Sequence, residues 1–334
     1  MLEETNKSML SDDSMALLLF CSRLGLEESS PLQPLTLREW NPLRVKIQAS
    51  TFLGPAGLKG ESAAEISRQL ELPEAEASRL RRLLDREDEV SAELKRLAAT
   101  GIRVMTRLDA EYPQRYRQRL KESAPPVMFY AGQPALLSQP GIAVVGSRNL
   151  DPVGQECAAF IGNACGLSGL VLYSGGARGV DSLSMNAALE ARGTAVGILA
   201  SNLDKTIRSP EICQALERGD LCLATPYLPG AGFSVGAAMG RNRLIYCLAD
   251  YAIVVASEAE KGGSWAGASE AMKAGWVPVF VLEHQAMPAG NRLLIEKGAR
   301  PFPHPFPDHF NRLPAWLQEN SQPSKPEATQ LGLF

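Results

Sequence analysis

The second half of the chain consists of short apolar runs, rich in β-branched residues, that alternate with helical segments. These runs lie at 142–145, 170–173, 195–199, 252–255 and 277–282. Strands of about four to eight residues that alternate with helices of roughly ten to fifteen residues are typical of βαβ units. In such units crossover helices join parallel strands and cover both faces of the sheet. The sequence therefore predicts an α/β fold with a parallel sheet between two layers of helices.

The region before residue 125 follows a different pattern, in which Leu, Ile and Val recur every three or four residues between charged side chains. This period predicts amphipathic helices, which we expect at 15–24, 43–52, 62–70, 74–84 and 87–99. We therefore expect a small all-helical domain at 1–124 and a sheet domain at 125–305, followed by a tether at 306–334.

The helix pair at 62–84 resembles a small DNA-binding helical hairpin. Its arginines Arg79, Arg81 and Arg82 are balanced by acidic residues such as Glu74 and Glu76. This balance favours the alternative, in which the pair only packs against the rest of the chain.

The segment 306–334 is polar and contains several prolines, which predicts a disordered tether with a short helix near 315–317. It ends in a pattern that resembles the sliding-clamp-binding peptide. In that peptide Leu331, Leu333 and Phe334 would fill apolar pockets, while Gln330 would fix the register by hydrogen bonds. The alternative is an ordinary apolar tail.

The charge of the chain limits what it can bind. It has 34 Lys and Arg against 37 Asp and Glu, a net charge of -3. Proteins that coat nucleic acid nonspecifically usually carry a basic excess, so any nucleic-acid site here must be local. The N-terminus is acidic and the sequence contains no long apolar run. We therefore expect neither a signal peptide nor a membrane-spanning helix. Six scattered cysteines predict free thiols in a reducing cytoplasm, with no metal site.

Glycine-rich loops follow the predicted strands, at the edge where parallel sheets bind ligands. Glycines let a phosphate approach the backbone, arginines hold it with two donors, and helix N-termini attract its charge. The candidate phosphate- or nucleic-acid-binding residues are Gly146, Ser147, Arg148, Ser174, Gly175, Gly176, Ala177, Arg178, Gly179, Arg241, Asn242, Arg243, Gly263, Ser264 and Trp265. The lack of a Gly-x-Gly-x-x-Gly fingerprint argues against an ordinary dinucleotide site, and the lack of a Walker motif excludes a P-loop ATPase.

Several of these residues have a structural alternative. Asp181 and Glu270 are possible pocket acids, but Asp181 is also suited to capping the helix that follows it. Trp265 is suited either to stacking on a base or to packing its helix against the sheet.

The third loop, over 232–240, is expected to lead into Arg241 and Arg243 at the opening of a helix. Arginines buried there need an anion or a carboxylate partner. The alternative to an anion is a salt bridge to Asp250 or Glu258.

In order and spacing these loops resemble the DNA-processing protein A (DprA/Smf) family over about residues 108–300. The resemblance implies an extended Rossmann-like domain that binds single-stranded DNA and has neither cofactor nor catalysis of its own. It also implies a homodimer and the loading of a RecA-type recombinase. By position in the family motifs, the phosphate ligands would be Ser147, Arg148, Arg178, Arg241 and Arg243.

Three departures from the family pattern open other functions. Met185 or a neighbour replaces a usual histidine, the helical N-terminal region is long, and we expect no winged-helix domain in the residues after 301. The segments 224–227 and 262–267 resemble a divergent branch whose members accompany toxin or effector proteins in phage defence. One alternative function is therefore an antitoxin or nucleotide-sensing partner of such an effector. Another is a nucleotide N-glycosidic hydrolase, related to cytokinin-activating phosphoribohydrolases, with Glu270 as the reacting carboxylate.

Overall fold

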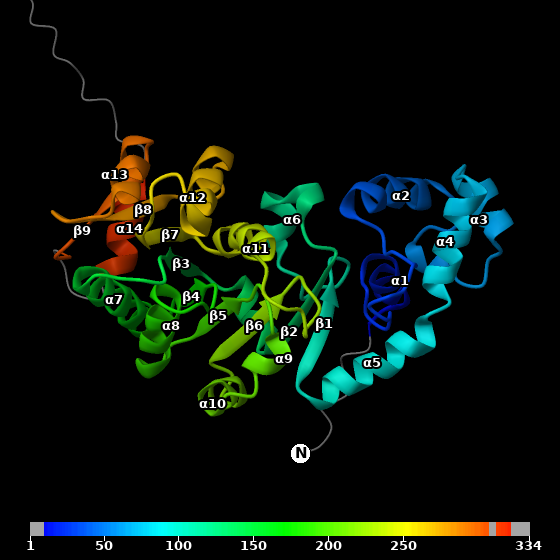
Figure 1. The fold of residues 1–334 in the computed structure, drawn as a ribbon, viewed down its shortest axis with the longest axis horizontal. Helices are drawn as coiled ribbons and strands as arrows, with labels where there is room; N and C mark the ends of the chain where they lie inside the picture. Colours follow the sequence, from blue (N-terminus) through cyan, green and yellow to red (C-terminus); the bar gives the residue numbers. More distant parts are fainter. Residues whose placement is uncertain (1–9, 307–311, 322–334) are drawn as a thin grey trace, which may run out of the picture.

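The computed structural model describes residues 10–306 and 312–321, and its central element is a nine-stranded, mostly parallel sheet (Figure 1). Across the sheet the strand order is β1-β2-β6-β5-β4-β3-β7-β8-β9. The strands are β1 (Ile102–Thr106), β2 (Val127–Gly132), β3 (Gly141–Gly146), β4 (Val171–Ser174), β5 (Ala195–Ile198), β6 (Leu221–Thr225), β7 (Tyr251–Ala256), β8 (Val279–Glu283) and β9 (Arg300–Pro303). The predicted α/β class and the strands β3, β4, β5, β7 and β8 are confirmed.

The order of the parallel strands reverses between β3 and β7. From β3 the chain adds β4, β5 and β6 on one side, and it then returns to add β7, β8 and β9 on the other. The loops after β3 and β7 therefore diverge and leave a crevice at the carboxyl edge of the sheet. In open α/β sheets ligands bind at this switch point.

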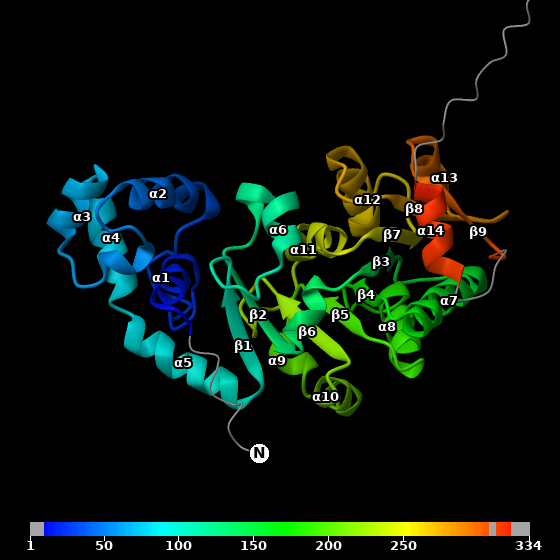
Figure 2. The same ribbon diagram turned by 180° about the vertical axis from the view of Figure 1, so that it is seen from behind.

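Helices cover both faces of the sheet, as the continuous burial of β3 requires (Figure 2). Ile142 and Val144 pack with α7 (Pro152–Ser168) and α8 (Val180–Glu190). The intervening Ala143 and Val145 pack in a second core with α11 (Val235–Leu248) and α12 (Gly262–Ala274). The remaining elements of this domain are α6 (Gln114–Arg119), α9 (Leu203–Thr206), α10 (Pro210–Glu217), α13 (Ala289–Glu296) and the 3₁₀ turns η2 (Lys121–Ser123) and η3 (Pro134–Ser138).

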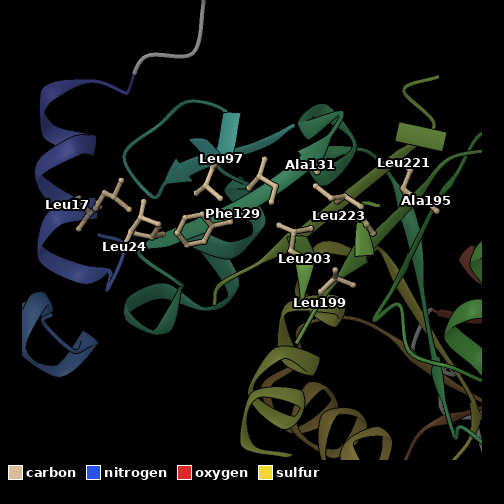
Figure 3. Packing of buried hydrophobic residues seen from close by; sticks show 14 of the residues in the cluster. Leu17, Leu24, Leu97, Phe129, Ala131, Ala195, Leu199, Leu203, Leu221 and Leu223 are labelled. Carbon is tan, nitrogen blue, oxygen red and sulfur yellow. The ribbon is translucent and has the colours of Figure 1, made fainter. Parts of the chain in front are cut away.

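A helical module precedes the sheet, as predicted. It contains α1 (Asp12–Cys21), α2 (Leu37–Ala49), η1 (Pro55–Leu58), α3 (Ala63–Leu70), α4 (Glu74–Leu84) and α5 (Glu87–Ala99). The helix α2 starts earlier than expected because Thr36 and Glu39 form a capping box. Figure 3 shows Leu17, Leu97 and Phe129 in one continuous apolar cluster, so the module and the sheet share a core.

The pair α3 and α4 is a packing unit. Ile66 and Leu80 are fully buried between the helices. Arg79 is held by Glu39 at 2.6 Å and by backbone carbonyls of Gln33 and Pro34, so this arginine is engaged inside the module. The structure thus favours packing over DNA binding for this pair.

The expected boundaries need two corrections. Residues 1–124 are not wholly helical, because β1 lies within them and pairs antiparallel with β2, which pairs in the same way with β6. The short helix expected near 315–317 is present as α14 (Leu313–Ser321), but it is not part of a tether, because it packs Leu313 and Leu317 into the core. The peptide at 330–334 lies outside the described residues. Within the described ranges, no helix is both long enough and apolar enough to cross a membrane.

Candidate functional site

A pocket of about 390 Å³ lies at the switch point of the sheet. It is lined by residues 145–149 at the end of β3 and in the loop after it, and by 256–258 and 261–264 from the end of β7 to the first turn of α12. Ala177 in the loop before α8 and residues of α8 and α11 complete the lining. We call it the switch-point pocket. The sequence-predicted residues Gly146, Ser147, Arg148, Ala177, Asp181, Arg241, Asn242, Gly263 and Ser264 all line it. The loops predicted to converge therefore do so here.

Arg241 is the most unusual side chain of this pocket. Only 7% of it is exposed, and its Nη1 lies 4.0 Å from Oδ2 of the buried Asp181. Its Nε and Nη1 donate no hydrogen bond to any described residue. A buried guanidinium with free donors costs several kcal/mol unless an acceptor reaches it. The geometry suits an anion that accepts from these donors.

The electrostatics of the pair reflect its burial. Burial raises the pKa of Asp181 above its ordinary value, and the charge of Arg241 opposes this shift. Burial likewise lowers the pKa of Arg241, and Asp181 opposes that shift. Asp181 is not the cap of α8, as the sequence suggested, because Gly179 occupies that position. Its Oδ2 instead accepts from the backbone N–H groups of Gly175 and Ala177, at 3.2 and 3.3 Å.

Two glycines are required by close approaches in this region. A Cβ on Gly175 would lie 1.4 Å from Nη1 of Arg241, so only glycine lets the guanidinium rest against this turn. Gly179 has φ +96°, and a Cβ there would lie 2.5 Å from the carbonyl oxygen of Ser147. The two predicted loops after β3 and β4 are thereby packed directly against each other.

The first turn of α12 forms another wall of the switch-point pocket. Its cap residue is Lys261, and Gly262, Gly263 and Ser264 follow at the helix start. A Cβ on Gly263 would lie 2.5 Å from Nδ2 of Asn242, which fixes this turn against α11. The N-terminus of a helix of this length presents free N–H groups and a partial positive charge, which favour anions.

A second pocket, of about 500 Å³, adjoins the first and shares Arg148, Ala177 and Arg241 with it. We call it the arginine pocket. Arg178 and Lys205 complete a set of four cationic lining residues, and no acidic residue lines it. Within residues 10–306 and 312–321, Arg178 and Lys205 form neither ion pairs nor side-chain hydrogen bonds. The arginine pocket therefore carries the uncompensated positive charge of the site.

Other predicted residues lie elsewhere. Ser174 is fully buried and donates to the carbonyl of Val144, which makes it structural. Trp265 is 9% exposed and packs α12 in the core, with Lys297 above its ring, so the packing alternative is the correct one. Glu270 is exposed and lines neither pocket.

The third loop was predicted with the wrong boundary. The helix α11 begins at Val235, where Ser234 caps it, and not near residue 241. Arg241 and Arg243 are thus mid-helix residues, and two positions along a helix is more than half a turn. Arg243 accordingly lines neither pocket, and its Nη2 lies 3.5 Å from the carbonyl of Ser123. Neither arginine pairs with Asp250, which instead holds Arg115 at 2.7 Å.

Sequence reasoning missed several lining residues. Phe233 and Lys205 line the arginine pocket, and Lys261 and Asn149 line the switch-point pocket. The one available signal was an aromatic residue, Phe233, inside a glycine-rich segment. No group of three or more His, Cys, Asp or Glu side chains is placed to bind a metal in the part of the chain that the structure describes.

The family model and the curated relatives agree on one family. A model of the family "DNA recombination-mediator protein A" matches residues 103–308. The chain is 30% identical to DNA processing protein DprA of Streptococcus pneumoniae over 185 residues, 53% of this chain and 63% of that protein. It is 28% identical to DprA of Bacillus subtilis over 183 residues, 53% of this chain and 60% of that protein. The chain thus spans less than two thirds of the length of these relatives.

Solved structures show the same fold. The X-ray structure of DNA processing protein A from Streptococcus pneumoniae matches with a TM-score of 0.57 at 22% identity, covering 80% of this chain and 95% of that one. DNA processing protein A from Helicobacter pylori, described for its single-stranded DNA binding mode, matches with a TM-score of 0.53 at 23% identity. That match covers 65% of this chain and 96% of the other.

Proposed function

Because this chain belongs to the DNA recombination-mediator protein A (DprA/Smf) family, we propose that it binds single-stranded DNA across the two adjoining pockets and acts in DNA processing and recombination. It would do so without catalysing a reaction of its own. The observation that carries the proposal is the arginine pocket, in which four cationic residues and no acidic residue line a space of about 500 Å³.

The pockets suit a phosphate backbone for two further reasons. The two pockets share Arg148 and Arg241 in their linings, so a strand that crosses from one pocket to the other would meet these two cations from either side. The free donors of Arg241 and the start of α12 add hydrogen bonds that an oxyanion accepts well. A site of this kind is local, which agrees with the net charge of -3.

A titration of the full chain with single-stranded DNA, duplex DNA and nucleoside monophosphates, each at several salt concentrations, tests this proposal. We expect the single strand to bind most tightly, and its affinity to fall with salt by a slope of about 0.7 per phosphate contacted. Arg178→Gln should weaken binding and lower this slope by about one contact. Lys95→Gln, which removes a charge from an exposed position on α5, is the matched control.

Equal affinity of the parent and Arg178→Gln for the single strand would refute the assignment of the arginine pocket. Tighter binding of a nucleoside monophosphate than of any strand would favour the nucleotide-sensing alternative. The hydrolase alternative loses its expected carboxylate, since Glu270 lies outside both pockets.

The proposed partners rest on sequence alone. The homodimer and the RecA-type recombinase come from the family resemblance, and docking to a sliding clamp comes from Gln330, Leu331, Leu333 and Phe334, which lie outside the described residues. A role in anti-phage defence or as an antitoxin, with a toxin or effector partner, comes from the divergent loops. Each of these stays a prediction, as does the cytoplasmic location.

A further inference from the structure

Phe233 is an aromatic side chain that the fold leaves exposed beside the cationic residues of the arginine pocket. It lies in the loop between β6 and α11, next to the cap residue Ser234, and 53% of it is exposed. It lines the arginine pocket but belongs to neither apolar core. Packing of the protein therefore does not account for an aromatic residue at this position.

The surroundings of Phe233 combine a ring with cations. The guanidinium of Arg148 lies over the ring, with its carbon 5.3 Å from the ring centroid. Arg178 and Lys205 line the same pocket. Sites for single-stranded nucleic acid combine these two components, because cations follow the phosphates while aromatic rings stack on the bases.

The rest of the lining distinguishes a nucleobase from an apolar protein segment. Ser201, Asn202 and Thr206 bring polar side chains to the pocket, and no acidic residue lines it. The exposed apolar residues nearby, Val235 and Met239, lie on the first turns of α11 and line neither pocket. An apolar partner would need these residues as part of its contact, whereas a flat base needs only the ring.

We propose that Phe233 stacks on one nucleobase of a strand whose phosphates contact Arg148, Arg178 and Lys205. This inference rests on the proposed function and adds a base-binding position to it. Stacking on a ring does not depend on the identity of the base, so the position tolerates any sequence. Arg148 would contribute both to the phosphate contact and to holding the ring.

The test separates bases from phosphates. The full chain, Phe233→Ala, Phe233→Trp and the control Val235→Ala would be titrated with an oligothymidylate and with an abasic strand of the same length and charge. We expect Phe233→Ala to lose roughly 5- to 150-fold in affinity for the oligothymidylate, the range for one stacked base. Its affinity for the abasic strand and its salt slope should not change. Phe233→Trp should retain binding, and Val235→Ala should match the parent.

A second readout follows the base itself. A strand carrying 2-aminopurine at one position at a time should lose fluorescence on binding at the position that stacks, and Phe233→Ala should abolish this change.

Unchanged affinity of Phe233→Ala for the oligothymidylate would overturn the inference and leave the exposed residues as a protein-docking surface. An equal loss on both strands would also overturn it, because the ring would then act through the phosphate contacts. If the parent binds neither strand, the proposed function itself is wrong. Binding by the parent with no effect at Phe233 refutes only the stacking.

Discussion

Replacing Gly175 by alanine tests whether the buried pair of Arg241 and Asp181 is packed against this turn as described. The new Cβ would lie 1.4 Å from Nη1 of Arg241, whereas real Cβ contacts are not shorter than 3.0 Å. The guanidinium must therefore retreat by about 1.6 Å. The Cβ would also lie 2.6 Å from Oδ2 of Asp181, so the carboxylate must move too.

The size of the effect follows from these distances. At an effective dielectric of about 20, the Arg241–Asp181 attraction is about 4 kcal/mol at the observed separation and about 3 kcal/mol after the retreat. Asp181 would also lose some of its bonds from the amides of Gly175 and Ala177, at roughly 1 kcal/mol or more each. We expect a loss of about 2–4 kcal/mol in the free energy of unfolding.

Urea unfolding and the single-strand titration together provide the assay. Gly175→Ala should unfold at a lower urea concentration and bind the strand roughly 10- to 100-fold more weakly, because the donors of Arg241 leave their positions. Gly236→Ala is the control, since a Cβ there meets nothing within 4 Å. A Gly175→Ala protein as stable as the parent, with the same affinity, would refute the reasoning.

Two further predictions concern the rest of the fold. The hydrogen bond from Arg79 holds the pKa of Glu39 at about 2, so the stabilisation from Glu39 is present above about pH 4.5 and is lost as the pH falls towards 2. Glu39→Gln should therefore lower the free energy of unfolding by about 1 kcal/mol at neutral pH, a small value because the carboxylate is partly exposed. In urea unfolding, the difference from the parent should vanish near pH 2. A difference that does not change with pH would contradict this. Leu317→Ala should lower the free energy of unfolding by about 2–4 kcal/mol in the same assay, because this side chain of α14 is fully buried. Gln318→Ala, at an exposed position of the same helix, should change it little. Equal effects of the two substitutions would show that α14 does not pack on the core.

Most of the strands that sequence analysis predicted contain two or three β-branched residues in a run that is buried on both faces of the sheet, and β4, with Val171 alone, is the exception. β6 was missed because Thr225 is the one β-branched residue in its sequence, Leu-Cys-Leu-Ala-Thr, although all five residues of the strand are buried. β1 was missed because it follows helices that have a strong helical period. Its partner β2 is antiparallel, and a pattern of alternating strands and helices does not predict such a pair.

The convergence of the loops could be predicted because it depends on topology, but the direction of single side chains could not. Glycines at 232, 236 and 240 indicated a loop, whereas Ser234 caps a helix that continues through Gly236 and Gly240. This shift of the helix start separates Arg241 from Arg243 and brings only Arg241 to the pockets. Trp265 was ambiguous for a similar reason, since only the packing of α12 decides whether its ring is buried.

The switch point has a consequence for how this protein responds to a ligand. The walls of its pocket come from segments at 145–149 and 256–264, which are widely separated in the sequence and meet only when the parallel sheet is complete. Partial unfolding that releases β3 or β7 therefore destroys the pocket. A bound ligand would then stabilise the sheet against opening as a whole, by about 2.7 kcal/mol at a hundred times its Kd. Ligand binding to the pocket and unfolding of the sheet domain are therefore coupled equilibria.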